Sequence, residues 1–193
     1  MQPALLNRLH QDHGRLARIL EALESKAAQA RSGVRGATLD TLATLVDYIA
    51  EYPDAVHHPL EDRVFAELLR KELTDQERRL VADNAGQHEQ LTAATRRLVA
   101  AIESLLARSD DAGAALQADV DRYVEIQRQH MRHEEELVFP LALARFSDAD
   151  WDRLAQDDAE AHDPLFDQRL SRFESLYEYA VTDTEAARHR ERY

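Results

Sequence analysis

Apolar residues recur at three- and four-residue steps along most of the chain, which is the spacing of one face of an α-helix. The four stretches with this spacing are Pro3 to about Arg31, Thr38 to about Leu69, Thr74 to about Arg108, and about Ala114 to Phe146. Runs of β-branched residues are almost absent, and the breaks between the stretches are short. The pattern therefore predicts an all-α protein, an up-down-up-down four-helix bundle with a short C-terminal helical extension.

Local signals define where some of these helices begin and where one of them is disturbed. Thr74 and Glu77 have the spacing of a capping box, which opens the third helix. Pro53 and Pro59 lie inside the second stretch. A proline within a helix removes a backbone hydrogen bond and clashes with the preceding turn, so we expect a kink or a local loosening there.

Two weaker helical patterns follow the fourth stretch. Ser147-Asp148-Ala149-Asp150 is a capping sequence for a short helix, and a final helix is predicted to start near Asp163-Pro164. The domain boundaries predicted from these patterns are residues 1–146 for the bundle, 147–181 for a helical extension packed on it, and 182–193 for a polar tail.

The composition narrows the class of protein and of partner. The chain has 193 residues, no cysteine and a formal net charge of −13. The lack of cysteine excludes disulfides, thiolate zinc sites and cysteine nucleophiles, and the acidity argues against DNA or RNA as a partner. No apolar run is long enough for a signal peptide or a membrane span, so we expect a soluble cytoplasmic protein.

Two stretches of sequence place a histidine four residues before a glutamate. These pairs are His57 with Glu61 and His130 with Glu134. Residues four apart lie on the same face of a helix, so each pair offers an imidazole nitrogen and a carboxylate to the same point. Imidazole and carboxylate together form a ligand set that suits iron, manganese or zinc.

The first and third predicted helices each add one histidine, His13 and His88. The chain therefore reads as two similar helix pairs, each with a histidine followed by a His-x-x-x-Glu motif. A single histidine or a single motif of this kind is common on exposed helix faces. Because all the elements recur together, one set per helix, the pattern predicts a metal site inside the bundle.

The stretches from Tyr52 to Phe65 and from His130 to Pro140 resemble those of haemerythrin-like (HHE cation-binding) proteins. Proteins of that family are four-helix bundles around a non-haem diiron centre. The resemblance covers about Leu5 to Phe146, and Asp150-Trp151 with Asp163-Pro164-Leu165-Phe166 is similar to an extension seen in bacterial members. The ligands that the resemblance implies are His13, His57, Glu61, His88, His130 and Glu134. It also implies two iron ions bridged by the two carboxylates.

The sequence departs from the oxygen-carrying haemerythrins at two positions. Those proteins have a second histidine on the third helix where this chain has Thr92, and their last carboxylate has the spacing of Glu135. On a regular helix Glu135 points about 140° away from His130, whereas Glu134 is only about 40° away. Four further residues lie beside the predicted ligands in the sequence: His10, His58, His133 and Glu135. The sequence leaves open whether they orient the imidazoles or are solvated surface residues.

Three functions fit this predicted site. The protein binds or senses O2 or NO, or it is an enzyme that reduces peroxide or NO with electrons from a partner, or it stores iron or donates it for iron-centre repair. All three use the same ligands, so the sequence leaves open whether the chain is an enzyme and whether it forms a homodimer. No acid–base constellation is visible apart from the predicted ligands, which slightly favours binding over catalysis.

Overall fold

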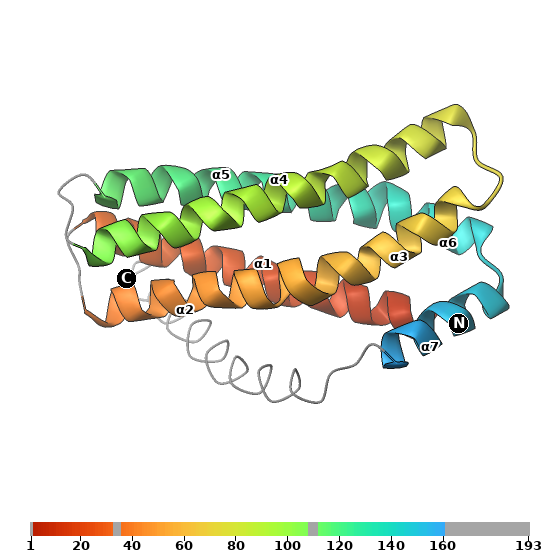
Figure 1. The fold of residues 1–193 in the computed structure, drawn as a ribbon, viewed down its shortest axis with the longest axis horizontal. Coiled ribbons are helices and arrows are strands. Elements are labelled where there is room, and N and C mark those ends of the chain that lie inside the picture. Colours follow the sequence, from red (N-terminus) through yellow and green to blue (C-terminus); the bar gives the residue numbers. More distant parts are fainter. Residues whose placement is uncertain (1, 33–35, 108–111, 161–193) are drawn as a thin grey trace, which may run out of the picture.

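The computed structural model describes residues 2–32, 36–107 and 112–160. These residues form helices and no strands, so the prediction of an all-α protein is confirmed (Figure 1). Within the same residues, no helix combines the length and the apolar character that crossing a lipid bilayer requires.

Four long helical rods lie alongside one another, and each runs in the opposite direction to the one before it (Figure 1). The rods are α1 (Ala4–Arg31); α2 (Ala37–Glu51), η1 (Pro53–His57) and α3 (His58–Leu69); α4 (Asp75–Leu106); and α5 (Ala112–His133), η2 (Glu134–Val138) and α6 (Phe139–Arg145). Helices α1 and α4 each pack against both α2 and α5, so the four rods surround a common interior.

The second rod is interrupted where the sequence places its two prolines. Pro53 opens the π-helical turn η1, and Pro59 is the second residue of α3. In η1 the His57 amide donates to the Tyr52 carbonyl at 3.1 Å, five residues back instead of four. The expected loosening is therefore a widened turn, and the second stretch is not one continuous α-helix.

The fourth rod contains a similar turn, η2, just before Pro140. The amide of Phe139 donates to the carbonyl of Glu134, again five residues back. The prediction of a single helix through this stretch is corrected in the same way, and α6 ends at Arg145. Both widened turns lie beside a proline, whose missing N–H prevents a regular hydrogen-bond ladder.

Capping residues begin α4 and α7 (Asp148–Glu160) as the sequence predicts. The Glu77 amide donates to Thr74 Oγ1 at 3.2 Å, and the Thr74 amide donates to Glu77 Oε2 at 2.7 Å. Ser147 and Asp150 make the same reciprocal pair at the start of α7. The final helix predicted from Asp163 lies outside the described residues.

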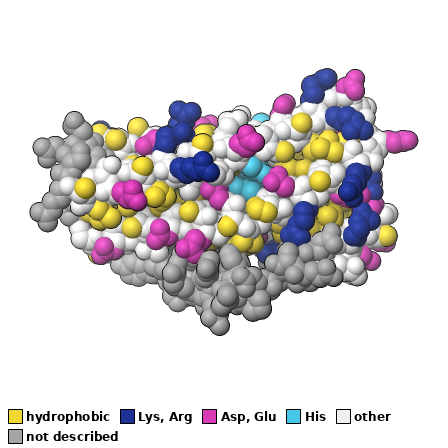
Figure 2. Space-filling view, in the orientation of Figure 1, with side chains coloured by type: hydrophobic (Ala, Val, Ile, Leu, Met, Phe, Trp, Pro, Cys, Tyr) yellow, Lys and Arg dark blue, Asp and Glu magenta, His cyan; other side chains and the backbone are white. Residues whose placement is uncertain are grey.

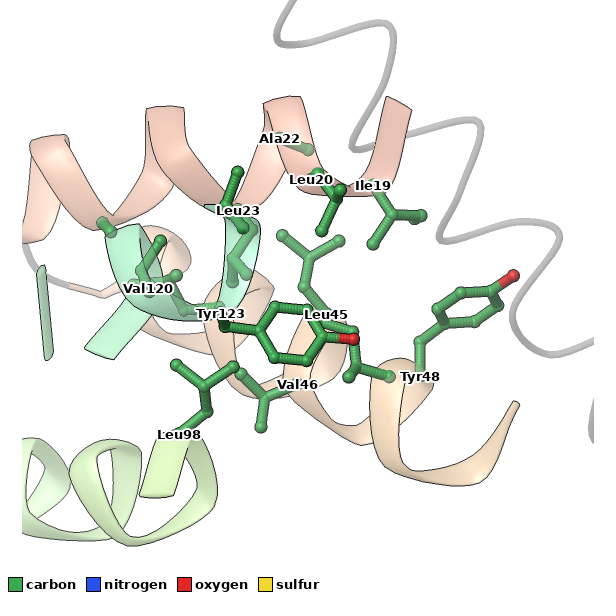
Figure 3. Packing of buried hydrophobic residues seen from close by; sticks show 14 of the residues in the cluster. Ile19, Leu20, Ala22, Leu23, Leu45, Val46, Tyr48, Leu98, Val120 and Tyr123 are labelled. Carbon is green, nitrogen blue, oxygen red and sulfur yellow. The ribbon is translucent and has the colours of Figure 1, made fainter. Parts of the chain in front are cut away.

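The apolar core consists of two clusters with a polar layer between them. The first cluster contains Tyr123 and its neighbours from all four rods (Figure 3), and the second gathers around Leu9, Phe65 and Trp151. Along α1, Leu9 belongs to the second cluster and Leu16 to the first, and the buried residues between them are Asp12 and His13. A buried polar layer thus crosses the middle of the protein.

We expect Leu98→Ala to lower the free energy of unfolding by about 2–5 kcal/mol, because it leaves a cavity beside Tyr123 in the first cluster (Figure 3). Leu106→Ala, in the same helix, is the matched control, since Leu106 is 55% exposed. Urea denaturation of both variants measures the difference. Equal losses of unfolding free energy in the two variants would contradict the packing described for α4.

Candidate metal centre

Five histidines from the four rods meet in the polar layer. They are His13 from α1, His57 from the end of η1, His58 from the start of α3, His88 from α4 and His130 from α5. All are buried, and Glu61 and Glu134 beside them are 0% exposed. The structure therefore brings together all six residues of the predicted ligand set and adds His58.

The first group of possible ligands contains His13, His57 and Glu61, whose ligand atoms lie within 4.8 Å of one another. The Nε2 atoms of His13 and His57 lie 3.1 and 3.0 Å from Glu61 Oε1. His13 Nε2 is also 3.3 Å from Glu134 Oε2. Both rings thus direct Nε2 toward the same oxygen, Glu61 Oε1.

The second group contains His58, Glu61, His88 and His130, also within 4.8 Å of one another. His88 Nε2 lies 3.4 Å from Glu61 Oε2, and His130 Nε2 lies 3.3 Å from Glu134 Oε2. The two Nε2 atoms of His88 and His130 are only 3.2 Å apart. Glu61 therefore faces the first group with one oxygen and the second group with the other.

His58 was left open by the sequence, and the structure places it in the second group. It is 2% exposed. The ring belongs to the first residue of α3, directly after the widened turn η1, whereas His57 is the last residue of that turn. Adjacent residues on a regular α-helix are about 100° apart, so an irregular turn at this point helps both rings to face the interior.

Each of the five rings has an acceptor near its other nitrogen, Nδ1. The acceptors are Glu135 for His13 at 2.8 Å, Asp12 for His57 at 3.6 Å, Asp54 for His58 at 3.4 Å, Asp62 for His88 at 2.8 Å and Gln87 for His130 at 3.1 Å. The contacts of His13, His88 and His130 are hydrogen bonds, which favour the tautomer that carries its proton at Nδ1 and leave the Nε2 lone pair facing the interior. Imidazoles that bind metal ions are commonly oriented in this way.

Glu135 lies beside the site without joining either group. The helical angles predicted that Glu134 points toward the site and Glu135 away from it. This holds in part, because Glu134 is fully buried and the Glu135 side chain is 35% exposed. Glu135 nevertheless reaches His13 with one oxygen and His10 with the other, at 2.8 and 3.1 Å. It acts as a partner that orients His13. His133 is half-buried and belongs to neither group.

Asn84 is a further residue that the sequence analysis missed. Its Nδ2 donates to Glu134 Oε1 at 3.0 Å, which holds that carboxylate with Oε2 toward the histidines. Asn84 lies one helical turn before His88 on α4, so its position on the inner face was the available signal. An asparagine at that position is equally compatible with a solvated surface.

The family model described as Hemerythrin HHE cation binding domain matches residues 4–142. The chain belongs to the haemerythrin HHE family. The match includes both groups of possible ligands and ends before α7. None of the curated proteins compared with the chain matches it. The resemblance seen in the sequence is thereby confirmed at the level of the family.

The buried atoms of this haemerythrin-family site fit a cation. His58 Nε2, Glu61 Oε2 and Glu134 Oε2 are buried and have no hydrogen-bond partner. Each such atom costs about 1–3 kcal/mol when it is left unsatisfied. Metal ions bound by these side chains would satisfy all three atoms, and a set of imidazole and carboxylate donors without sulfur suits iron, manganese or zinc.

Opposite charges set the proton affinity of three rings in the metal-free protein. Burial disfavours the charged form of His57, but Glu61 and Asp12 outweigh it and raise its pKa to about 9. Burial is likewise outweighed at His88, where Asp62 and Glu61 raise the pKa to about 9. The pKa of His13 is raised for the same reason, chiefly by neighbouring glutamates.

Burial prevails over the neighbouring charges at His58 but is outweighed by them at Glu61. It lowers the pKa of His58 to about 4, since this ring has weaker carboxylate contacts, so His58 is neutral near pH 7. Burial alone would raise the pKa of Glu61, but His57 and His13 outweigh it and hold that pKa well below its usual range. The metal-free site therefore keeps protons on some rings and an ionised carboxylate between them.

The metal-free protein should lose stability as pH rises from about 6.5 to about 9. The pKa values of His57 and His88 are higher in the folded state than the ordinary value, so the folded state binds their protons more tightly. This contribution to the free energy of unfolding is complete below the ordinary histidine pKa. It disappears as the pH rises past the raised pKa of the folded state. Urea denaturation in the presence of a chelator measures it, and His57→Gln/His88→Gln should show a smaller loss. Equal losses in both proteins would contradict the assignment.

Proposed function

We propose that this haemerythrin-family protein is an up-down-up-down four-helix bundle that holds two non-haem iron ions and binds or senses O2 or NO. In this proposal His13 and His57 hold one ion, and His58, His88 and His130 hold the other. Glu61 and Glu134 lie between the two ions. The single observation that carries the proposal is that Glu61 turns a different oxygen toward each group of imidazoles.

The number of donors supports two ions rather than one. Five imidazoles and two carboxylates exceed the four ligands of a tetrahedral site, and the five imidazoles separate into two groups that share Glu61. Two carboxylates between two ions leave each ion with a mixed nitrogen and oxygen environment. Such sites are built inside helix bundles from side chains on facing helices.

Iron, when bound, would supply reversible redox chemistry and a position for a diatomic ligand. The chain's own residues hold the ligand rings and limit access by water. The acceptors at Nδ1 fix the rings, and the apolar clusters on both sides of the layer reduce hydration of the site. Preset donors between two apolar clusters are suited to reversible binding.

The carboxylates around the site favour binding over catalysis. Glu135 and Asp62 make hydrogen bonds to the rings of His13 and His88, so these two are occupied in orienting ligands. Asp12 and Asp54 lie 3.6 and 3.4 Å from the rings of His57 and His58. A peroxide- or NO-reducing enzyme would gain from an additional side chain that moves protons. Reduction of peroxide or NO, and storage or donation of iron, are the alternative outcomes of the experiment below.

The experiment is anaerobic reconstitution with Fe(II), followed by optical spectra after addition of O2, NO or peroxide. A stable adduct with O2 or NO supports the binding function. Rapid turnover of peroxide or NO with an electron donor would replace it with the enzyme. Transfer of the iron to an acceptor protein would replace it with iron handling.

His58→Ala should lower the iron content from about two ions per chain to about one, because the second group loses a donor and the first does not. His133→Ala is the matched control and should keep both ions. Metal analysis after gel filtration measures the content. Equal iron content in the two variants would remove His58 from the ligand set.

Glu135→Gln should weaken iron binding by about 10- to 100-fold without abolishing it, because it alters the acceptor that orients His13. Glu136→Gln, at the exposed neighbouring position, should bind iron as the unchanged chain does. Competition with a chelator of known affinity measures both. Complete loss of one ion in Glu135→Gln would instead make Glu135 a direct ligand.

A further inference from the structure

An open cavity of about 400 Å³ leads from the surface to one side of the site. It lies between residues 54–62 of the second rod and residues 88–96 of α4, and its lining includes His58 and His88. A neighbouring cavity of about 320 Å³ shares Asp54, Thr92 and Arg96 with it. Figure 2 shows histidine side chains at the surface midway along this face, with acidic side chains beside them.

The charged side chains that line the larger cavity are mostly acidic. Asp54, Asp62 and Glu89 contribute three carboxylates, and the cationic side chains of the lining are Arg96 and, in the metal-free protein, the protonated His88. Asp62 and Glu89 are exposed, whereas Asp54 is half-buried. A concave surface with an excess of one charge concentrates ions of the opposite charge. This cavity therefore favours a cation over an anion.

The inner end of the cavity offers one metal-ligating nitrogen, Nε2 of His58, that no hydrogen bond occupies. His58 is 2% exposed, and neither of its ring nitrogens has a hydrogen-bond partner. The neighbouring His88 is held by Asp62 at 2.8 Å, so its ring is oriented too. Both histidines belong to the second group, whereas His13 and His57 line neither of the two cavities.

We propose that this cavity is the route by which divalent metal ions reach the site, and that the second group receives them first. The proposal rests on the proposed function, since it requires that the two groups hold metal. Asp62 and Glu89 attract the hydrated ion at the surface, Asp54 lies beside the path, and His58 offers the first imidazole. Glu61 then connects the second group to the first.

The test is the rate at which the metal-free full chain takes up Co²⁺, followed by stopped-flow absorption in the visible range. Glu89→Lys reverses a charge at the cavity and touches no proposed ligand. Glu103→Lys makes the same charge change at an exposed position of the same helix, away from the cavity lining. Thr92→Trp places a large side chain in the space that both cavities share.

Glu89→Lys should slow uptake by about three- to tenfold at low ionic strength, and the difference from Glu103→Lys should shrink as salt is added. Thr92→Trp should slow uptake at every ionic strength. Both variants should still reach about two ions per chain at equilibrium, as the proposed donor set requires.

Two results would overturn this access route. In one, Glu89→Lys and Glu103→Lys slow uptake equally, which is an effect of net charge alone. In the other, Thr92→Trp takes up Co²⁺ at the unchanged rate while circular dichroism shows an intact helical fold. If either variant result comes with about two Co²⁺ ions per chain at equilibrium, the proposed function stands and only the access route is wrong. An unchanged chain that takes up no Co²⁺ would overturn the proposed function as well.

Discussion

The packing of this protein depends on keeping a charged layer in the middle of an otherwise apolar interior. Two glutamates at 0% exposure lie among five buried imidazoles, with an apolar cluster on each side. Burying carboxylates is costly unless opposite charge accompanies them. In the metal-free state that charge is supplied by protons on His13, His57 and His88, whose pKa values are raised by the same carboxylates. In the state that we propose, metal ions supply this positive charge. Protons and metal ions therefore compete for the same buried side chains.

The widened turns η1 and η2 give this layer its geometry. Each lies in the middle of a rod and beside a proline, and each adjoins residues of the site. η1 ends at His57 and is followed at once by His58, while η2 begins at Glu134 and continues with Glu135. At both places two consecutive side chains serve the site, which a regular α-helix does not favour. The local irregularity thus increases the number of side chains that one rod contributes to the site and its surroundings.

Much of this arrangement could be predicted from the sequence because it follows helical periodicity. The helical stretches and the six predicted ligands were read from spacings of three and four residues and from their recurrence in two helix pairs, and the structure brings those six residues together. His58 was not assigned, because regular angles do not hold beside η1. Asp62 and Gln87 were missed for another reason: each meets a histidine from a different rod, and such contacts leave no period in the sequence.

The measurement that tests the central claim most directly is anomalous diffraction at the iron absorption edge from crystals of the iron-loaded protein. Two peaks are expected in the polar layer, one beside Nε2 of His13 and His57 and the other beside Nε2 of His58, His88 and His130. Glu61 should contact both peaks, one with each oxygen. A single peak, or iron bound outside this layer, would contradict the account of a two-ion site centred on Glu61.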